Sequence, residues 1–564
     1  MTEAPPAPHP RGTRRLAVAA DVAADAQELI AGIVAAPWGQ VSPSVYETGR
    51  LVTLAPWLTG HGRRIAFLLD AQRPDGGWGP PDDGYALVPT LSATEALLAV
   101  LGDGTVPAGA GLDGAAIAAA AGRGLRFLGR LLPGPLDLPD MPAIELISPA
   151  LIIRLNRWLE AAREHPCAGS EGWPAGGLPL PAGMGDTKLT LVRELLLSGA
   201  DVPQKLLHAL EIAGDAACGL PRIRPESTGT IGASPAATAA WLGDRTPADP
   251  SNPARWHLET VSAQHGGPVP VGFPLTVFER AWVMSWLVRA GVPVTAPPEL
   301  VLSLTAPLGP HGTPAADGLP ADADTTSGAL YALALLGAPH RPDPLWEYEN
   351  DTHFSTWRGE DGSSITTNTH VLEAFGQYLA QAGEDLADPG SVRRYAATVA
   401  KVAGWLRGQQ GPDGAWTDRW HASPYYATSC CAIALDRFDG ERSADAVARA
   451  RRWVLETQRP DGSWGRWQGT AEETAYAVQL LLLTGGGPDG KRDGQRDGQR
   501  DEEIVRAATR GRGILEGYLQ RAGDARMDPP LWHDKDLYHP TAIVRAGVLA
   551  ALHLIRTGWP NSLK

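Results

Sequence analysis

The sequence predicts an all-α protein built from two α/α barrels, and three observations lead to this fold class. Apolar residues recur at the i, i+3, i+4 spacing of amphipathic helices along most of the 564 residues. No convincing run alternates apolar and polar residues as a half-buried strand does. One short motif occurs three times at positions where helix pairs would turn. A chain of this length exceeds one ordinary core, so at least two domains are expected.

Helical segments follow one another along the chain, and about fifteen can be counted from their periodicity. The clearest, in order, are 91–102, 149–164, 187–199, 274–291, 368–383, 471–485 and 541–558. Gly, Pro and Asp stand at the joins, where they end helices and form turns. One segment, 485–503, reads GGGPDGKRDGQRDGQRDEE. It is too polar to bury a core, so we expect a disordered surface loop there.

The repeated motif begins with Gln and ends with Trp six residues later. Its copies are QRPDGGW at 72–78, QGPDGAW at 410–416 and QRPDGSW at 458–464. Pro-Asp-Gly forms a turn, because Pro presets φ, Asp bonds back to the backbone and Gly accepts a positive φ. We expect the Gln side chain to cap a neighbouring helix end while the Trp ring stacks nearby, which would join outer to inner helices. One early copy and two late copies indicate two related barrels.

Composition and charge exclude several classes of protein. A net charge of −14 argues against a general nucleic-acid binder, which needs a basic stripe. The four cysteines have no C-x-x-C spacing, so neither a disulfide framework nor a structural zinc site is expected. The first residues lack the uninterrupted apolar core of a signal peptide, and no run of 18 apolar residues occurs. We expect a cytoplasmic monomer or homodimer without integral membrane association.

Two carboxylates and two hydroxyls stand at the start of one apolar helix. Residues 318–337 read GLPADADTTSGALYALALLG, so Asp322 and Asp324 are followed by Thr325 and Thr326. Helix capping by itself explains such residues, because their oxygens accept bonds from the first free N–H groups. Two close carboxylates also cannot both ionise easily, so one of them is kept as a neutral acid. On this stretch alone, capping is the simpler interpretation.

The Gln-to-Trp repeats, taken together with this Asp-x-Asp-Thr-Thr stretch, resemble the class II terpene cyclases. More specifically, the chain resembles the bacterial two-domain (βγ) type related to plant copalyl diphosphate synthases. The similarity extends from about residue 41 to about residue 555. The segments that carry it, in order, are 41–58, 145–152, 206–215, 229–242, 266–282, 423–429, 458–477 and 531–546.

This resemblance implies two terpenoid cyclase toroids, with the γ barrel inserted after the first helix of the β domain. We expect an N-terminal β-domain segment at 1–47, the γ domain at 48–290 and the rest of the β domain at 291–564, with the substrate cavity between the barrels. The implied reaction protonates the terminal alkene of a linear prenyl diphosphate and retains the diphosphate. By family motif Asp324 is the proton donor, and Asp322 orients it or hydrogen-bonds to it.

Thr325 departs from the commonest family pattern, Asp-x-Asp-Asp, which has a third acid at this position. The variant resembles that of bacterial drimenyl diphosphate synthases, which use the C15 substrate farnesyl diphosphate, and of some meroterpenoid cyclases. Most bacterial enzymes that act on C20 geranylgeranyl diphosphate keep the third acid. We therefore expect a sesquiterpene cyclase that makes drimenyl diphosphate. The alternative is a diterpene cyclase that makes a copalyl-type diphosphate from geranylgeranyl diphosphate.

Aromatic faces stabilise carbocations by about 1–2 kcal/mol each when desolvated. Nineteen tryptophans against seven phenylalanines suit such a site, although structural stacking explains many tryptophans equally well. The candidates that lie in family-like segments are Phe354, Trp357, Trp420, Tyr425, Tyr426, Trp532 and Tyr538. About half of them should line the pocket, and the others should pack in the core.

The diphosphate needs positive charge. The family holds Mg²⁺ with an acidic γ-domain motif, for which Glu211 and Asp215 are the candidates at i, i+4 on one helix face. A solvated helix face explains the same two acids. Arg419 and Lys535 are candidate direct partners of the phosphate, although either can be an ordinary surface charge.

The base for the terminal deprotonation stays undetermined. An asparagine contributes in the plant enzymes, but Val271 or Gly272 stands at the corresponding place in this sequence. His370 and Asn368 are weak candidates, and for the histidine a place in the core is the simpler interpretation.

Other classes fit the sequence less well. A class I terpene synthase needs Asp-Asp-x-x-Asp, and the pair at 82–83 continues with Gly-Tyr-Ala. A squalene-type cyclase would keep the third acid and carry an apolar docking helix. A zinc prenyltransferase needs an Asp two residues before a Cys, which neither Cys430 nor Cys431 has. A structural helical scaffold without cyclase activity is the remaining remote alternative.

Overall fold

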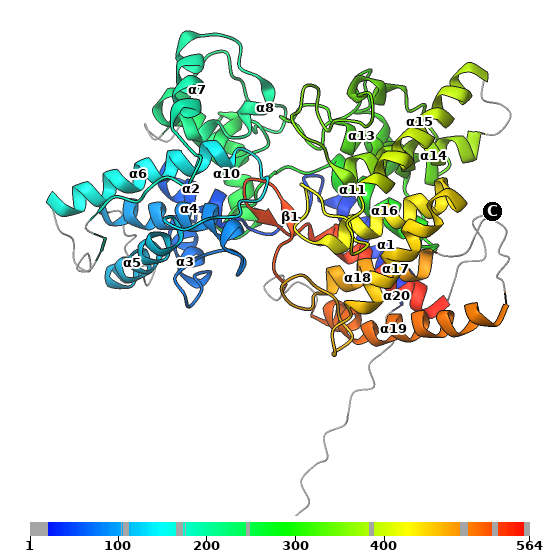
Figure 1. Ribbon diagram of the computed structural model, residues 1–564. Helices are drawn as coiled ribbons and strands as arrows, with labels where there is room; N and C mark the ends of the chain where they lie inside the picture. Colours follow the sequence, from blue (N-terminus) through cyan, green and yellow to red (C-terminus); the bar gives the residue numbers. More distant parts are fainter. Residues whose placement is uncertain are drawn as a thin grey trace, which may run out of the picture.

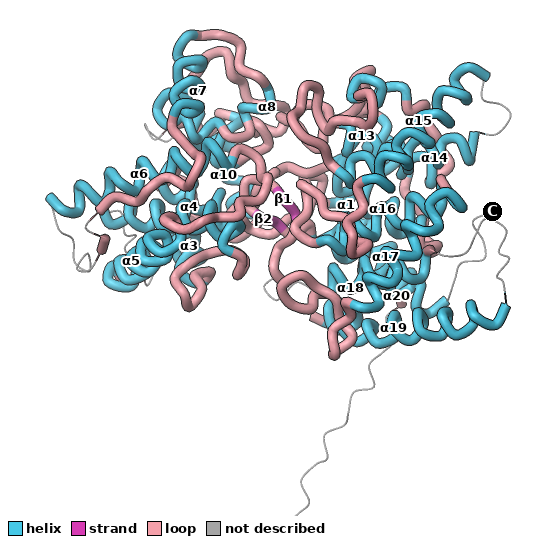
Figure 2. The backbone as a smooth tube through the Cα atoms, viewed as in Figure 1, coloured by secondary structure: helices cyan, strands magenta, loops and turns pink. Residues whose placement is uncertain are grey.

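The structure is a computed structural model of the chain, and it describes residues 21–102, 104, 112–164, 173–174, 176–243, 249–382, 389–484, 494–521 and 528–557. Helices dominate the described residues and form two lobes, with one two-stranded hairpin between them (Figures 1 and 2). The all-α fold class predicted from helical periodicity is confirmed.

The N-terminal lobe is drawn from blue to green in Figure 1 and contains the helices from α2 to α10. Its elements are α2 (Val45–Leu54), α3 (His61–Asp70), α4 (Asp83–Gly102), α5 (Gly114–Leu131), α6 (Ile144–Glu164), α7 (Thr187–Ser198), α8 (Gln204–Leu207), the 3₁₀ segment η1 (Leu210–Ala217), α9 (Pro235–Leu242) and α10 (Pro253–Gln264).

The C-terminal lobe contains the first helix of the chain and everything from α11 onward. Its elements are α1 (Val22–Ala35), α11 (Val277–Arg289), α12 (Pro298–Thr305), α13 (Ala323–Leu335), η2 (Asp343–Tyr348), α14 (Ile365–Ala382), α15 (Pro389–Gly408), α16 (Pro424–Phe438), η4 (Gly440–Ser443), α17 (Ala444–Glu456), α18 (Ala471–Leu483), α19 (Gly494–Gln520), β1 (Trp532–His533), β2 (Leu537–Tyr538) and α20 (Thr541–Thr557).

The chain begins in the C-terminal lobe with α1, forms the N-terminal lobe from α2 to α10 and returns to the C-terminal lobe at α11. Helix α1 packs against α20 and α11, although nine helices and η1 separate α1 from α11 along the chain. The predicted insertion after the first helix is thereby confirmed. The expected boundary at 290 is wrong by one helix, because α11 packs against α13 and α20 and its apolar side chains belong to the core of the C-terminal lobe.

The Gln-to-Trp repeats join neighbouring helices as predicted, but the Trp indole rather than the Gln amide bonds to a helix end, and all three copies use the same contacts. In the third copy, the Gln458 amide donates to the carbonyls of Gly462 and of Ala507 in α19, at 2.9 Å each. The Trp464 indole donates at 2.7 Å to the carbonyl of Val454 in α17. The corresponding bonds of the other copies start from Gln72, Trp78, Gln410 and Trp416.

Glycine is required in the turn of each repeat. Gly462 has φ +89°, and a Cβ there would lie 2.5 Å from the carbonyl oxygen of Arg510. The turn therefore lies directly against the next outer helix, which explains why a seven-residue motif can join two helices.

The polar segment 485–503 is helical where the structure describes it. Residues 485–493 lie outside the described residues, while α19 begins at Gly494. The prediction of a disordered loop is therefore wrong from residue 494 onward. The apolar residues that α19 packs against the C-terminal core, Ile504, Ala507, Ala508 and Leu515, all follow residue 503, beyond the repetitive stretch.

Among the described residues, one helix has the length and apolar character of a membrane span. It covers Gly84–Gly102, within α4, and 94% of its most apolar window is buried inside the protein. Burial of this kind is what a core helix of a lobe shows.

Replacing Trp464 by Phe should destabilise the C-terminal lobe. The ring stays apolar, but the buried carbonyl of Val454 loses its indole donor, which costs about 1–3 kcal/mol. The midpoint of thermal unfolding measures this loss. The same replacement at Trp256, whose side chain is 53% exposed, is the matched control and should change little. Equal midpoints for the two variants would contradict a stabilising role of the Trp464 hydrogen bond.

Candidate active site

A cavity of about 510 Å³ lies between the lobes. The N-terminal lobe contributes residues around the start of α6 and from α8 to η1, and the C-terminal lobe contributes the first turns of α13, α14 and α16 and the β1–β2 hairpin. Its aromatic lining residues are Phe278, Trp357, Trp420, Tyr426, Trp532 and Tyr538. The cavity thus combines a largely aromatic wall with the first turns of three inner helices.

Five of the seven predicted aromatic residues line this cavity. Phe354 does not, because it is fully buried in the core against Trp346 and Phe375. Tyr425 does not either, because its ring packs on Trp453 at 4.6 Å between centroids. For these two residues the core-packing alternative is correct. Phe278 lines the cavity, and it was missed although it lies in the aromatic stretch of 274–291.

Asp322 is both a helix cap and a buried acid. Its carboxylate accepts the Thr325 N–H at 2.6 Å at the N-terminus of α13. Burial, and then the nearby charge of Asp324, raises the pKa of Asp322 to about 8. The carboxyl group therefore keeps its proton at neutral pH. The capping and acid interpretations of this stretch hold together.

Asp324 lies in the first turn of α13 and pairs with a histidine from the next inner helix. Its Oδ1 is 2.7 Å from Nδ1 of His370 on α14. In the described part of the chain, Oδ2 of Asp324 makes no hydrogen bond, and the residue lines the cavity. Burial opposes a charged imidazole, but the charge and hydrogen bond of Asp324 hold the pKa of His370 well above its ordinary value. The two side chains therefore act as one hydrogen-bonded unit at the start of α13.

The His370 imidazole is held in place on a second side. Its ring meets Trp282 edge-on at 4.8 Å between centroids, and the Trp282 indole donates to the Tyr426 hydroxyl at 2.9 Å. His370 was considered as a terminal base, but its contact with Asp324 makes it part of the acid group. Asn368 is also unsuited to that role, because its amide is fully used by the backbone of Phe354 and Ser364.

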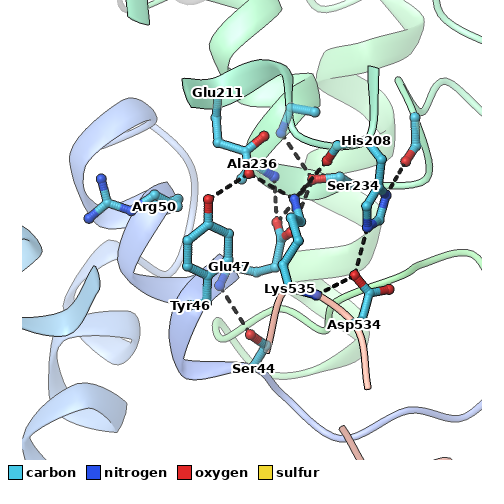
Figure 3. Close-up of polar contacts among 12 residues, drawn as sticks. Ser44, Tyr46, Glu47, Arg50, His208, Glu211, Ser234, Ala236, Asp534 and Lys535 are labelled. Atoms are coloured by element: carbon cyan, nitrogen blue, oxygen red, sulfur yellow. Dashed lines mark hydrogen bonds and ion pairs between the residues drawn. The ribbon is translucent and has the colours of Figure 1, made fainter. Parts of the chain in front are cut away.

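Lys535 was expected to bind phosphate directly, and this prediction is wrong. Its ammonium has no exposure and lies 2.5 Å from Glu47 and 2.8 Å from Glu211 (Figure 3). It also donates to the Ser234 hydroxyl and to the His208 carbonyl. Burial opposes the charge, but Glu211 and Glu47 outweigh it and raise the lysine pKa. All donor capacity is used inside the protein, so none remains for a ligand.

Glu211 and Asp215 border a second cavity, of about 220 Å³, although not for the predicted reason. They lie on the 3₁₀ segment η1, which is broken at Gly214 (φ 62°, ψ −135°), so they do not share an α-helical face. Four arginines border the same space: Arg50, Arg154, Arg157 and Arg193. Within the described ranges, no group of three or more His, Cys, Asp or Glu side chains is placed to hold a metal.

The carboxylates of this arginine cavity suit a hard cation such as Mg²⁺ only if an anionic ligand supplies further oxygen atoms. Glu211 Oε1 accepts bonds from Tyr46 and Lys535, whereas Oε2 is buried without a partner. One free oxygen of Glu211 and the exposed Asp215 carboxylate are oxygen ligands of the kind that Mg²⁺ uses together with phosphate. The two acids fit a metal that arrives with an anionic ligand.

Arg419 lines the main cavity, but its Nη groups are engaged. Nη1 bonds to Glu360 and Nη2 to Asp140, at 2.7 Å each. Asp140 belongs to the N-terminal lobe, so this ion pair crosses the cavity mouth. The Nε group is buried without a partner in the described structure. Nη1 also donates to the Asp361 carbonyl, so the Nε–H and one Nη2–H of Arg419 are the donors without a partner among the described residues.

The pair His208–Asp534 also lines the cavity, and the sequence did not predict it. His208 Nε2 is 2.7 Å from Asp534 Oδ1, and His208 Nδ1 is 2.6 Å from the Gly232 carbonyl oxygen. Burial opposes both charges, but each partner stabilises the other: the pKa of His208 is raised and that of Asp534 is lowered. The residues are 326 positions apart, and no spacing in the sequence signals their contact.

The chain is similar in sequence to a known family of proteins. Residues 366–480 match the model of the squalene-hopene cyclase C-terminal domain. The chain is 42% identical over 529 residues to an ent-copalyl diphosphate synthase of Streptomyces sp. (strain KO-3988), covering 94% of this chain and 95% of that protein. It is 40% identical over 531 residues to a labda-7,13-dienyl diphosphate synthase of Streptomyces clavuligerus, covering 93% and 92%.

A solved structure gives the same result. The ent-copalyl diphosphate synthase from Streptomyces platensis superposes with a TM-score of 0.85 at 43% sequence identity, covering 95% of this chain and all of that one. Fold and sequence therefore agree over nearly the whole chain.

Replacing Lys535 by Met should strongly destabilise the protein, because Glu47 and Glu211 would be left buried without their counter-ion. Removing one partner of a buried pair costs about 3–5 kcal/mol of unfolding free energy. Denaturant unfolding measures the loss. Lys188→Met is the matched control, since that side chain is 70% exposed. If both variants unfolded at the same denaturant concentration, the Lys535 cluster would not stabilise the fold.

Proposed function

Because the chain belongs to the class II terpene cyclases, we propose that it cyclises geranylgeranyl diphosphate to a bicyclic, copalyl-type diphosphate and retains the diphosphate group. The observation that carries the proposal is the group of Asp322, Asp324 and His370 at an aromatic cavity, in which Asp322 and His370 are buried. A buried carboxylic acid facing aromatic rings is what protonation of an alkene needs.

The C20 substrate is favoured over the C15 substrate expected from Thr325. The curated relatives that are 38–42% identical to this chain are named as copalyl or labdadienyl diphosphate synthases. Thr325 contacts Asp322, at the end of the cavity where the acid meets the terminal isoprene unit. Both substrates present the same unit there, so this position says little about chain length. Farnesyl diphosphate remains the second candidate, on the Thr325 motif alone.

In this proposal, Asp324 gives its proton to the terminal alkene carbon. The Nδ1–H of His370 donates to Oδ1, which leaves Oδ2 to carry the acidic proton into the cavity. Burial holds Asp322 neutral beside it. No second carboxylate charge therefore opposes the ionisation of Asp324. After transfer, the carboxylate charge is stabilised by the imidazole N–H.

The growing carbocation then meets the rings of Trp357, Trp420 and Tyr426 and of the hairpin residues Trp532 and Tyr538. These faces attract positive charge without acting as nucleophiles, so they stabilise the cation and leave it unquenched. Two of the rings are fixed by contact, since Trp357 meets Trp420 edge-on at 5.2 Å between centroids.

The diphosphate end is proposed to extend toward the arginine cavity. Lys535 connects the linings of the two cavities, because it bonds to Glu211 of the arginine cavity and to the carbonyl of His208, which lines the main cavity. Arg154, Arg157 and Arg193 would bind phosphate oxygens there, while Glu211 and Asp215 would hold Mg²⁺. When bound, the metal would supply charge neutralisation of the diphosphate.

A product assay tests the proposal. Purified protein with Mg²⁺ receives geranylgeranyl or farnesyl diphosphate, then phosphatase, and the alcohols are identified by gas chromatography–mass spectrometry. A bicyclic C20 alcohol is expected. A bicyclic C15 alcohol from farnesyl diphosphate alone would keep the mechanism and overturn the substrate. Recovery of both linear alcohols intact would overturn the cyclase proposal.

Asp324→Asn should lower kcat by about 10²–10⁴-fold, the usual contribution of a general acid. Asp322→Asn should lose less, because an amide is neutral, as the protonated acid is, and can still cap α13. A greater loss at Asp322 than at Asp324 would reverse the two roles. Far-ultraviolet circular dichroism of both variants controls for folding.

The wild-type rate should fall as the pH rises through about 8, because Asp322 then loses its proton and its charge opposes ionisation of Asp324. Below that pH the carboxyl group stays neutral and the rate should not depend on it. In Asp322→Asn this alkaline decrease should disappear. An unchanged decrease in the variant would assign it to another group.

A further inference from the structure

The cavity contains a second acid–base pair, opposite in character to the group that starts the reaction. Once a cation has formed, a C–H bond beside it must break, and the acceptor of that proton must be unprotonated, border the cavity and keep a free lone pair. We propose that Asp534 accepts this final proton at Oδ2, with His208 as the residue that positions it. The inference rests on the proposed function and identifies the residue that ends the same reaction.

The two oxygens of Asp534 have different surroundings. Oδ1 is occupied, because it accepts the Lys535 N–H at 2.5 Å and contacts His208 Nε2. Oδ2 accepts no hydrogen bond within the described residues, and Figure 3 draws the dashed lines from one oxygen only. The side chain keeps 16% exposure and belongs to the cavity lining. The free oxygen is therefore open to the cavity.

Gly272 leaves that oxygen uncovered. It lines the same cavity, has φ +59°, and a Cβ built on it would lie 2.5 Å from Asp534 Oδ2. Any side chain at position 272 would collide with the carboxylate or displace it. The glycine is thus required at the point where the oxygen meets the cavity.

His208 keeps Asp534 ionised and fixed. Both of its ring nitrogens face acceptors, Asp534 Oδ1 and the Gly232 carbonyl, so the ring is an imidazolium that donates twice. It cannot accept a proton itself. A carboxylate that is a weak base suffices, because a C–H bond adjacent to a carbocation is very acidic.

The other cavity groups are less suited. Asp322 and Asp324 begin the reaction, and Asp140 is paired with Arg419. His533 donates Nδ1–H to the Arg419 carbonyl, and its Nε2 is buried without a partner among the described residues. A proton on His533 would create a buried imidazolium cation, whereas a proton on Asp534 neutralises a carboxylate charge.

The step balances within the cavity. The C–H bond beside the cationic carbon breaks, its electron pair becomes the new C=C bond, and the proton forms an O–H bond with Oδ2. Asp324 has given one proton and Asp534 has gained one, so the diphosphate product is an isomer of the substrate. Exchange with water between turnovers restores both groups.

The test compares the full-length wild type with Asp534→Asn, using Glu145→Gln, an acid on the cavity rim with 45% side-chain exposure, as the matched control. Each is assayed with the substrate that the wild type cyclises. Asp534→Asn should still consume substrate, but the share of the wild-type alkene should fall at least about tenfold, in favour of water-captured alcohols or double-bond isomers. Glu145→Gln should give the wild-type profile.

Two results overturn the inference alone: an unchanged product profile in Asp534→Asn, or complete loss of consumption in a variant that unfolds at the wild-type temperature. If Asp534→Asn fails to fold, Gly272→Ala decides, since its methyl group covers Oδ2 and should produce the same shift in products. A wild type that cyclises neither substrate overturns the proposed function and this inference together. His208→Gln should shift the profile in the same direction but less, because glutamine can still donate to Oδ1.

Discussion

The ammonium group of Lys535 cannot remain charged in a dry interior unless carboxylates from elsewhere in the chain reach it. Glu47 comes from α2, Glu211 from η1, and Lys535 from the turn of the β1–β2 hairpin. Desolvating these ions costs several kcal/mol each, which only close mutual contact offsets. The hairpin is thereby held against the N-terminal lobe. Since Trp532 and Tyr538 flank the same turn, this cluster also sets where the aromatic wall stands.

The hairpin turn has a different role on each side. Lys535 points into the ionic cluster, while Asp534 borders the main cavity and is balanced by His208. Two charged groups of the cavity lining, Asp534 and Arg419, are therefore paired with His208 and Asp140, and aromatic rings line the same space. At the start of α13, burial keeps Asp322 neutral, and His370 forms a hydrogen bond with Asp324. One low-dielectric space thus holds an acid and an ionised carboxylate at neutral pH.

Local physical chemistry explains which sequence predictions succeeded. Trp464 bonds to Val454 and Gln458 to Gly462, both within ten residues, so the turn that joins the helices could be foreseen from local sequence. Asp322 caps α13 for the same reason. Glu211 and Asp215 show the limit: their spacing suggested one helix face, but the backbone breaks at Gly214. Lys535 failed as a phosphate partner because its two carboxylate partners lie more than 300 residues earlier in the chain.

The sequence by itself determined the all-α class, the insertion of one barrel into the other, the acid-bearing helix start and the family that these features resemble. Each depends on residues close together in the chain or on their order. Only the tertiary structure decided which aromatic rings face the cavity, that Lys535 is sealed inside, and that His208 meets Asp534 across 326 residues. Those facts depend on how the two lobes pack. Burial and ion pairing decide which side chains are protonated and which reach the cavity, and both arise only once the lobes have packed.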